Sequence, residues 1–98
     1  MTKKIIALAA QVEAKPEFIE YIKNAGIEVA KLTQQEPLCI QYNFHQDNDN
    51  PAIFLFFEYW NGQEGLDAHM ATDHLQAFLK DIDGKIIELK VNNMNKLA

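Results

Sequence analysis

The fold of this chain is decided by residues 52–60, which read AIFLFFEYW. Successive side chains of a β-strand point to opposite faces of the sheet, so this stretch presents two rows of side chains. One row contains Phe54, Phe56 and Trp60, and the other contains Ile53, Leu55, Phe57 and Tyr59. Because both rows are apolar, other parts of the folded protein must cover both faces of the strand.

The patterns on either side of this strand predict an α+β domain with the order β-α-β-β-α-β. Four stretches have the composition of strands, and they are residues 4–13, 38–46, 52–60 and 85–92. Apolar residues recur at helical spacing over residues 16–33 and, with a break at Thr72, over residues 63–82. This order is that of the ferredoxin-like fold, a four-stranded antiparallel sheet with its helices on one face.

The same patterns give finer expectations. In the second strand, one face should carry Leu38, Ile40, Tyr42 and Phe44. In the helix that begins at residue 63, Leu66 and Met70 should point inward. We expect residues 1–98 to form one domain, with a loosely ordered tail over residues 93–98.

The hydrophobic content is high for a chain of this length. Of the 98 residues 48% are hydrophobic, among them six phenylalanines, three tyrosines and one tryptophan. Since helices of the predicted fold cover only one face of the sheet, one apolar row of residues 52–60 would meet water in a monomer. Exposing that row forgoes about 1.5–3 kcal/mol for each large side chain. The sequence therefore predicts a homodimer that forms through the open sheet face.

The charged residues and the single cysteine exclude several partners. The formal net charge is −5, and all nine basic residues are lysines dispersed among acids. Without arginine the chain lacks the fork that contacts phosphate or guanine, so neither nucleic acid nor an anionic membrane is expected as a partner. The apolar run over residues 5–10 is too short for a signal sequence, which favours a cytoplasmic protein. Cys39 has no partner for an intrachain disulfide or a cysteine-based zinc site.

Several short motifs carry a resemblance to a known family. They are residues 36–42 (EPLCIQY), 45–47 (HQD), 49–51 (DNP), 57–60 (FEYW) and 66–75 (LDAHMATDHL). In order and spacing the chain resembles the antibiotic biosynthesis monooxygenase (ABM) domain family, especially its small quinol-monooxygenase-like members. The resemblance covers residues 4–92 and is specific from residue 36 to residue 78.

This resemblance implies a dimeric α/β-barrel whose subunits each hold a pocket between sheet and helices. It also implies oxidation of electron-rich aromatic compounds by molecular oxygen without metal or flavin. Trp60 stands where polyketide-tailoring members carry a pocket tryptophan, but Phe56 replaces its polar partner, which argues against anthrone oxidation. Leu38 replaces a glycine that is usual in the family and affects only the entry of the strand.

His69 and Glu58 are the candidate catalytic residues. A histidine titrates near neutral pH and can act as a general base in a pocket, and the family motif has histidines at positions 69 and 74. Glu58 is the one charge within residues 52–60, and a buried carboxylate must pair, protonate or face a polar cavity. We expect Glu58 to orient His69. The structural alternatives are a histidine that only closes the helix junction and a Glu58–lysine ion pair.

The remaining candidates would bind the substrate. Trp60, Phe56 and His74 would shape the cavity, although an aromatic stripe is also typical of a protein core. Tyr42 and Asn43 would line the cavity or simply pair across the hairpin.

No metal and no cofactor is expected from the sequence. His69 and His74 are five residues apart across a helix break, whereas metal ligands on one helical face are three or four apart. Heme is disfavoured because the resemblance places Leu79 where heme-degrading relatives carry the ligating histidine, and His69 where they carry a tryptophan.

Three functions fit these residues. The first is a cofactor-independent monooxygenase that oxidises a quinol or a related phenol with molecular oxygen, His69 being the base. The second is an isomerase or tautomerase of a small phosphorylated ketone, which would need lysines to bind the phosphate. The third is a module that binds an aromatic metabolite without turning it over. A shared fold does not decide between them.

Overall fold

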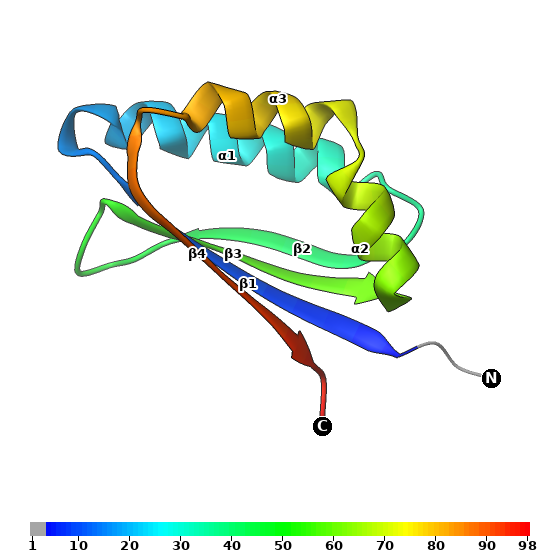
Figure 1. Cartoon of the computed structure of the whole chain (residues 1–98). Coiled ribbons are helices and arrows are strands. Elements are labelled where there is room, and N and C mark those ends of the chain that lie inside the picture. Colours follow the sequence, from blue (N-terminus) through cyan, green and yellow to red (C-terminus); the bar gives the residue numbers. More distant parts are fainter. Residues whose placement is uncertain (1–3) are drawn as a thin grey trace.

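The computed structural model describes residues 4–98 (Figure 1). Its elements, in chain order, are β1 (Ile5–Ala14), the 3-10 turn η1 (Pro16–Phe18), α1 (Ile19–Thr33), β2 (Cys39–Gln46), β3 (Ile53–Asn61), α2 (Gly62–Met70), α3 (Asp73–Ile82) and β4 (Ile86–Asn95). Residues 1–3 of the predicted domain lie outside the described part of the chain. Within residues 4–98, no helix combines the length and the apolar character that crossing a membrane requires.

The four strands form one antiparallel sheet in the order β2-β3-β1-β4. α1 and α3 lie over one face of the sheet, and α2 lies near the end where β3 finishes (Figure 1). The opposite face carries no helix in the part of the chain that the structure describes. The predicted ferredoxin-like α+β fold, with helices on one face of a four-stranded antiparallel sheet, is confirmed.

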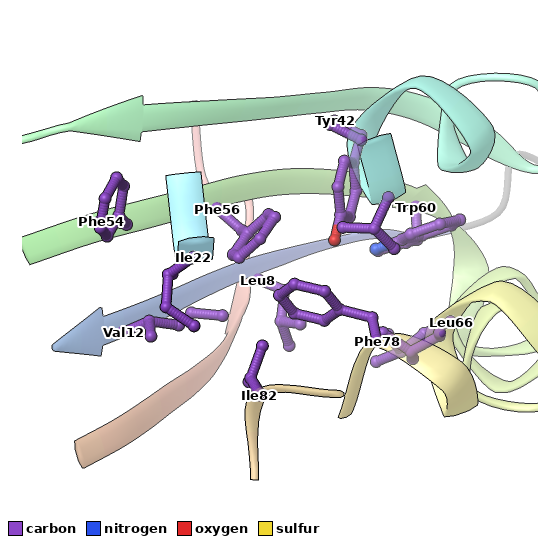
Figure 2. Close-up of a cluster of buried hydrophobic side chains, with 14 of the residues drawn as sticks. Leu8, Val12, Ile22, Tyr42, Phe54, Phe56, Trp60, Leu66, Phe78 and Ile82 are labelled. Atoms are coloured by element: carbon purple, nitrogen blue, oxygen red, sulfur yellow. The ribbon is translucent and has the colours of Figure 1, made fainter. Parts of the chain in front are cut away.

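Burial alternates residue by residue along β3. The buried row under the helices is Phe54, Phe56, Glu58 and Trp60, and the partly buried row on the open face is Ile53, Leu55, Phe57 and Tyr59. Figure 2 shows the apolar side chains of this inner row, Phe54, Phe56 and Trp60, in one cluster with Ile22 of α1 and with Phe78 and Ile82 of α3. The two rows predicted from residues 52–60 are therefore confirmed, and only one of them is covered by helices.

α1 approaches β2 very closely at Gly26. A Cβ atom at this position would lie 2.2 Å from Cζ of Phe44. The Phe44 ring has little room to yield, because it stacks on Phe54 with 5.3 Å between centroids and lies 4.4 Å from the Phe56 ring. Glycine therefore allows the helix to rest directly on the aromatic cluster of β2 and β3.

The start of β2 differs from the predicted alternation. The register between β2 and β3 shifts between Cys39 and Gln41, as in a β-bulge. As a consequence Ile40 is 52% exposed, whereas Cys39 packs against the core. The prediction that Ile40 shares a face with Tyr42 was wrong, because strict alternation fails at a bulge.

Two further details also differ from the predictions. On α2, Leu66 is buried as predicted, but Met70 is 45% exposed and His69 takes the buried position. β4 pairs with β1 as far as the Asn95–Ile6 pair. Residues 93–95 therefore extend the strand and do not form the loose tail that was predicted.

Candidate functional site

A pocket of about 170 Å³ lies between the sheet and the helices. Most of its lining is apolar: Leu8, Ala10, Val12, Phe56, Met70, Leu75, Phe78, Leu79, Ile82, Leu89 and Val91. Tyr42, Glu58 and His69 are the polar side chains among the described residues that line it. Apolar walls with a few polar groups are typical of a site for a small organic molecule.

His69 forms part of the pocket wall and is held from two sides. Its side chain is 2% exposed, near the end of α2. The ring stacks on Trp60, with 4.5 Å between centroids and 29° between planes. Its Nδ1 atom lies 2.9 Å from Oε2 of Glu36, a residue outside the pocket lining. Because Nδ1 is directed at Glu36, the other ring nitrogen, Nε2, is the one left to meet a molecule in the pocket.

Glu36 binds both histidines of the motif through one oxygen. Nε2 of His74 lies 2.7 Å from the same Oε2 atom. A carboxylate accepts hydrogen bonds, so each histidine donates an N–H to it. His69 therefore carries its proton on Nδ1, which leaves a lone pair on Nε2.

Thr72 fixes the helix junction that brings the two histidines together. Its hydroxyl donates to the carbonyl oxygen of His69 over 2.7 Å and accepts from the N–H of Leu75 over 3.3 Å. The break predicted at Thr72 is thus confirmed, and Thr72 is the N-cap that begins α3 directly after α2 ends. This tight junction lets two histidines five residues apart reach the same carboxylate.

Burial lowers the pKa of His69 below its ordinary value of 6.5. The hydrogen bond to Glu36 and the charge of that carboxylate raise the pKa, and the neighbouring His74 lowers it, but burial is the largest effect. At neutral pH the ring is therefore neutral, which is the form that accepts a proton.

Glu58 is the second titratable group of the pocket. It is 2% exposed, and its Oε1 atom accepts a hydrogen bond from Nε1 of Trp60 over 2.9 Å. Burial raises the pKa of Glu58 to about 7, although the Trp60 hydrogen bond lowers it; the charge of Glu36 raises it further. Burial is also the main reason why the pKa of the nearby Tyr42 phenol is raised. Tyr42 thus remains a neutral hydroxyl.

The structure brings together four of the seven predicted site residues. Tyr42, Phe56, Glu58 and His69 line one pocket. Trp60 is fully buried behind His69 and does not line the pocket. It therefore belongs to the core, which was the alternative interpretation of the aromatic stripe.

The other two predicted residues do not reach the pocket. His74 lies on the outer side of Glu36, beside a groove between α1 and α3. Asn43 is exposed on β2, opposite Phe57 of the open sheet face. Its assignment to the substrate site is therefore corrected, since its neighbour Tyr42 occupies the inward position.

Glu36 was not among the predicted site residues, and its contact with His69 was expected of Glu58 instead. In the structure Glu58 contacts Trp60, and Glu36 contacts His69. The available signal was the position of Glu36 at the start of the family-like stretch 36–42. No spacing rule joins it to His69, because 33 residues separate the two.

Comparison with known proteins identifies the family. The sequence profile of the family described as antibiotic biosynthesis monooxygenase matches residues 5–81. The chain belongs to this family.

Several individual proteins are similar to this ABM-family chain. A crystal structure named antibiotic biosynthesis monooxygenase is 31% identical and covers 95% of this chain and 99% of its own, with a TM-score of 0.89. Protein PA3566 from Pseudomonas aeruginosa shares the fold, with a TM-score of 0.95 at 23% identity over 100% of this chain and 99% of that one. Uncharacterized protein sll1783 from Synechocystis sp. is 30% identical over 88% of this chain. The chain spans 60% of the length of that curated relative.

The raised pKa of Glu58 predicts a pH dependence of stability. Between the ordinary value of 4.5 and about 7, the folded protein holds a proton on Glu58 that the unfolded chain releases. The free energy of unfolding therefore falls as pH rises through this window, by about 3 kcal/mol for this group. Glu58→Gln should remove that loss, so the variant gains stability relative to wild type between pH 5 and pH 8.

Urea unfolding at several pH values measures this difference. The control is Glu20→Gln, which removes an exposed carboxylate of α1 and should follow the wild-type pH profile. If Glu58→Gln and wild type keep a constant difference across the pH range, the buried carboxyl of Glu58 is not protonated in the folded protein.

Proposed function

We propose that this protein is a cofactor-independent monooxygenase that oxidises a quinol or a related phenol with molecular oxygen. The observation that carries the proposal is His69, a neutral buried imidazole on the wall of an apolar pocket, with its Nδ1 atom held by Glu36. Membership of the ABM family supports the reaction class. The substrate itself supplies the electrons in this reaction.

The first step is proton transfer. A substrate hydroxyl near Nε2 of His69 gives up its proton, and the phenolate that forms is a better electron donor than the phenol. The charge of Glu36 stabilises the imidazolium across the Nδ1 hydrogen bond of 2.9 Å. A base positioned in this way contributes about 10²–10⁴-fold to the rate.

The later steps consume one oxygen molecule for each quinol. The phenolate transfers one electron to O₂, and the resulting semiquinone and superoxide combine to form a bond between a ring carbon and oxygen. Cleavage of the O–O bond leaves one oxygen atom on the ring and releases the other as water, with a proton returned by His69. A hydroquinone and O₂ thus give a hydroxyquinone and water, and the substrate provides all four electrons.

The size of the pocket limits the substrate. A cavity of about 150 Å³ in another protein binds benzene, so the pocket of about 170 Å³ suits one substituted aromatic ring. We therefore propose a monocyclic quinol, with its ring against Phe56 and Phe78.

Glu58 and Tyr42 are suited to bind the second hydroxyl of such a quinol. Both groups line the pocket along with His69. An ionised Glu58 accepts a hydrogen bond, and the neutral Tyr42 phenol donates one. Two polar anchors besides the base would fix which hydroxyl loses its proton.

The lining gives less support to the alternatives. A phosphorylated ketone needs a cation near its phosphate, and the described residues that line the pocket include no lysine. A binding module without turnover fits the same pocket, and the His69 variant below separates it from an enzyme.

The open face of the sheet supports the homodimer predicted from the sequence. Phe57 and Tyr59 project from β3 on this face, with ring centroids 5.2 Å apart, and both remain partly exposed. Their cross-strand neighbours on β1 are the small residues Ala9 and Ala7, which leave space for a second sheet to approach. We propose that two subunits pair through these faces.

Replacement of His69 tests the catalytic proposal. His69→Asn removes the base while retaining a polar side chain, and kcat for oxygen uptake with monocyclic quinols should fall by about 10²–10⁴-fold. An oxygen electrode measures the uptake, and circular dichroism checks that the variant is folded. His45→Asn is the control, because His45 is exposed on β2 and should leave kcat unchanged.

Two results would contradict this proposal. Wild-type protein that binds monocyclic quinols but consumes no oxygen would favour the binding module. Folded His69→Asn protein with wild-type kcat would show that another group takes the proton.

A charge on the open face tests the dimer. Phe57→Lys should convert the dimer into a monomer, because pairing through this face would bury a charged lysine of each subunit among apolar side chains. Ile27→Lys is the control, since Ile27 is 39% exposed on α1, in the helical layer. Sedimentation velocity at micromolar concentration measures both. A monomeric wild-type protein, or a Phe57→Lys protein that stays dimeric, would exclude pairing through this face.

A further inference from the structure

Glu36, His69 and His74 form a cluster of potential metal ligands on the outer side of the pocket wall. One ligand atom from each residue lies within 4.8 Å of the other two. The carboxylate oxygen is 2.9 Å from His69 Nδ1 and 2.7 Å from His74 Nε2. The three residues come from the loop before β2, from α2 and from α3.

We infer that this cluster binds one divalent transition-metal ion of the zinc class, and that the bound ion inhibits the enzyme. Two imidazole nitrogens and one carboxylate oxygen are a common protein ligand set for zinc, with water as the fourth ligand. Zinc lies about 2.0–2.2 Å from such atoms, which puts neighbouring ligand atoms roughly 3–3.5 Å apart. The distances from Glu36 to the two histidines are slightly shorter than this. Small shifts of the three side chains would therefore let the ion take the place of the two hydrogen-bonding protons.

The spacing of the two histidines in the sequence did not favour a metal site. Five residues separate them, and one helical face would not present both. The junction at Thr72 ends α2 and begins α3, and both imidazoles turn toward the third ligand, Glu36. The fold therefore brings both histidines to one carboxylate, although their spacing in the sequence did not favour a metal site.

Access and surroundings also fit a metal site. His74 and Glu36 have side chains that are 20% and 11% exposed, so the ion can enter from the surface without crossing the pocket. Cys39 is the free thiol of the chain, but burial raises its pKa to about 11, and it is not part of the cluster. Nitrogen and oxygen ligands therefore define the site.

Metal at Nδ1 would change what His69 presents to the pocket. A neutral imidazole bound to a metal through Nδ1 carries its proton on Nε2. The lone pair that accepts the substrate proton is then absent, so the ion would block the first step of the reaction. This inhibitory part rests on the proposed function, whereas the binding site does not.

Calorimetric titration of the metal-free protein with zinc chloride tests the site directly. We expect one ion per chain. His74→Gln and Glu36→Gln should each weaken binding by at least about tenfold, since even changes next to metal ligands cost 10–100-fold. His45→Gln and Cys39→Ser are the controls, and they should bind zinc as wild type does.

The site is overturned if wild type shows no saturable binding, or if both cluster variants bind zinc as tightly as wild type. It is also overturned if His45→Gln or Cys39→Ser abolishes binding, because the ion would then lie elsewhere. Circular dichroism confirms folding of each variant, and the two cluster variants provide independent tests.

Oxygen uptake tests the inhibition separately. Zinc at saturating concentration should reduce wild-type turnover at least tenfold, chelation should restore it, and His74→Gln should need at least tenfold more zinc for the same effect. Tight binding with unchanged turnover would overturn inhibition and leave the site in place. Tight binding by a protein that turns over no quinol would overturn the proposed function, and inhibition with it, while the site would stand.

Discussion

One carboxylate oxygen, Oε2 of Glu36, accepts hydrogen bonds from both histidines of the helix junction. Hydrogen bonds to a charged acceptor are about twice as strong as neutral ones, and partial burial shields this group from competing water. The two bonds join the segment after α1 to the junction of α2 and α3. They also determine which nitrogen of His69 keeps its proton, and the chemistry of the pocket depends on this choice.

The sheet provides the other half of the site. The alternation of β3 places Phe56 and Glu58 in the pocket and Trp60 behind the His69 ring. Trp60 also donates to Glu58, so one buried indole contacts both Glu58 and His69. The opposite row of β3 is available for a second subunit. A single strand therefore contributes to the core, to the pocket and to the proposed interface.

Local patterns predicted most of the fold because alternation and helical spacing depend on neighbouring residues. Residues 52–60 predicted their two faces, and Thr72 predicted the start of α3, since a cap requires only the next three residues. Ile40 was misplaced because a β-bulge arises from pairing with another strand. His69 and Met70 differ by one position on a short helix, and the packing of α2 against the sheet decides which one is buried.

The candidate site was harder to predict than the fold. His69 and Glu58 were found because a histidine in a motif and a charge in an apolar strand are conspicuous in the sequence. Glu36 was not found, because its role depends on contacts with residues 33 and 38 positions away. Asn43 was placed in the pocket together with Tyr42, although alternation puts neighbouring residues of a strand on opposite faces. Long-range contacts and strand register thus account for what was missed.

The chemistry of the pocket depends on Glu36 holding His69 with its proton on Nδ1 and a free lone pair on Nε2. Nitrogen-15 NMR of the histidine side chains in metal-free protein measures this directly at neutral pH. We expect a neutral His69 ring with a protonated Nδ1 and an Nε2 shift typical of an unprotonated nitrogen. A His69 ring protonated on Nε2, or on both nitrogens, would contradict it.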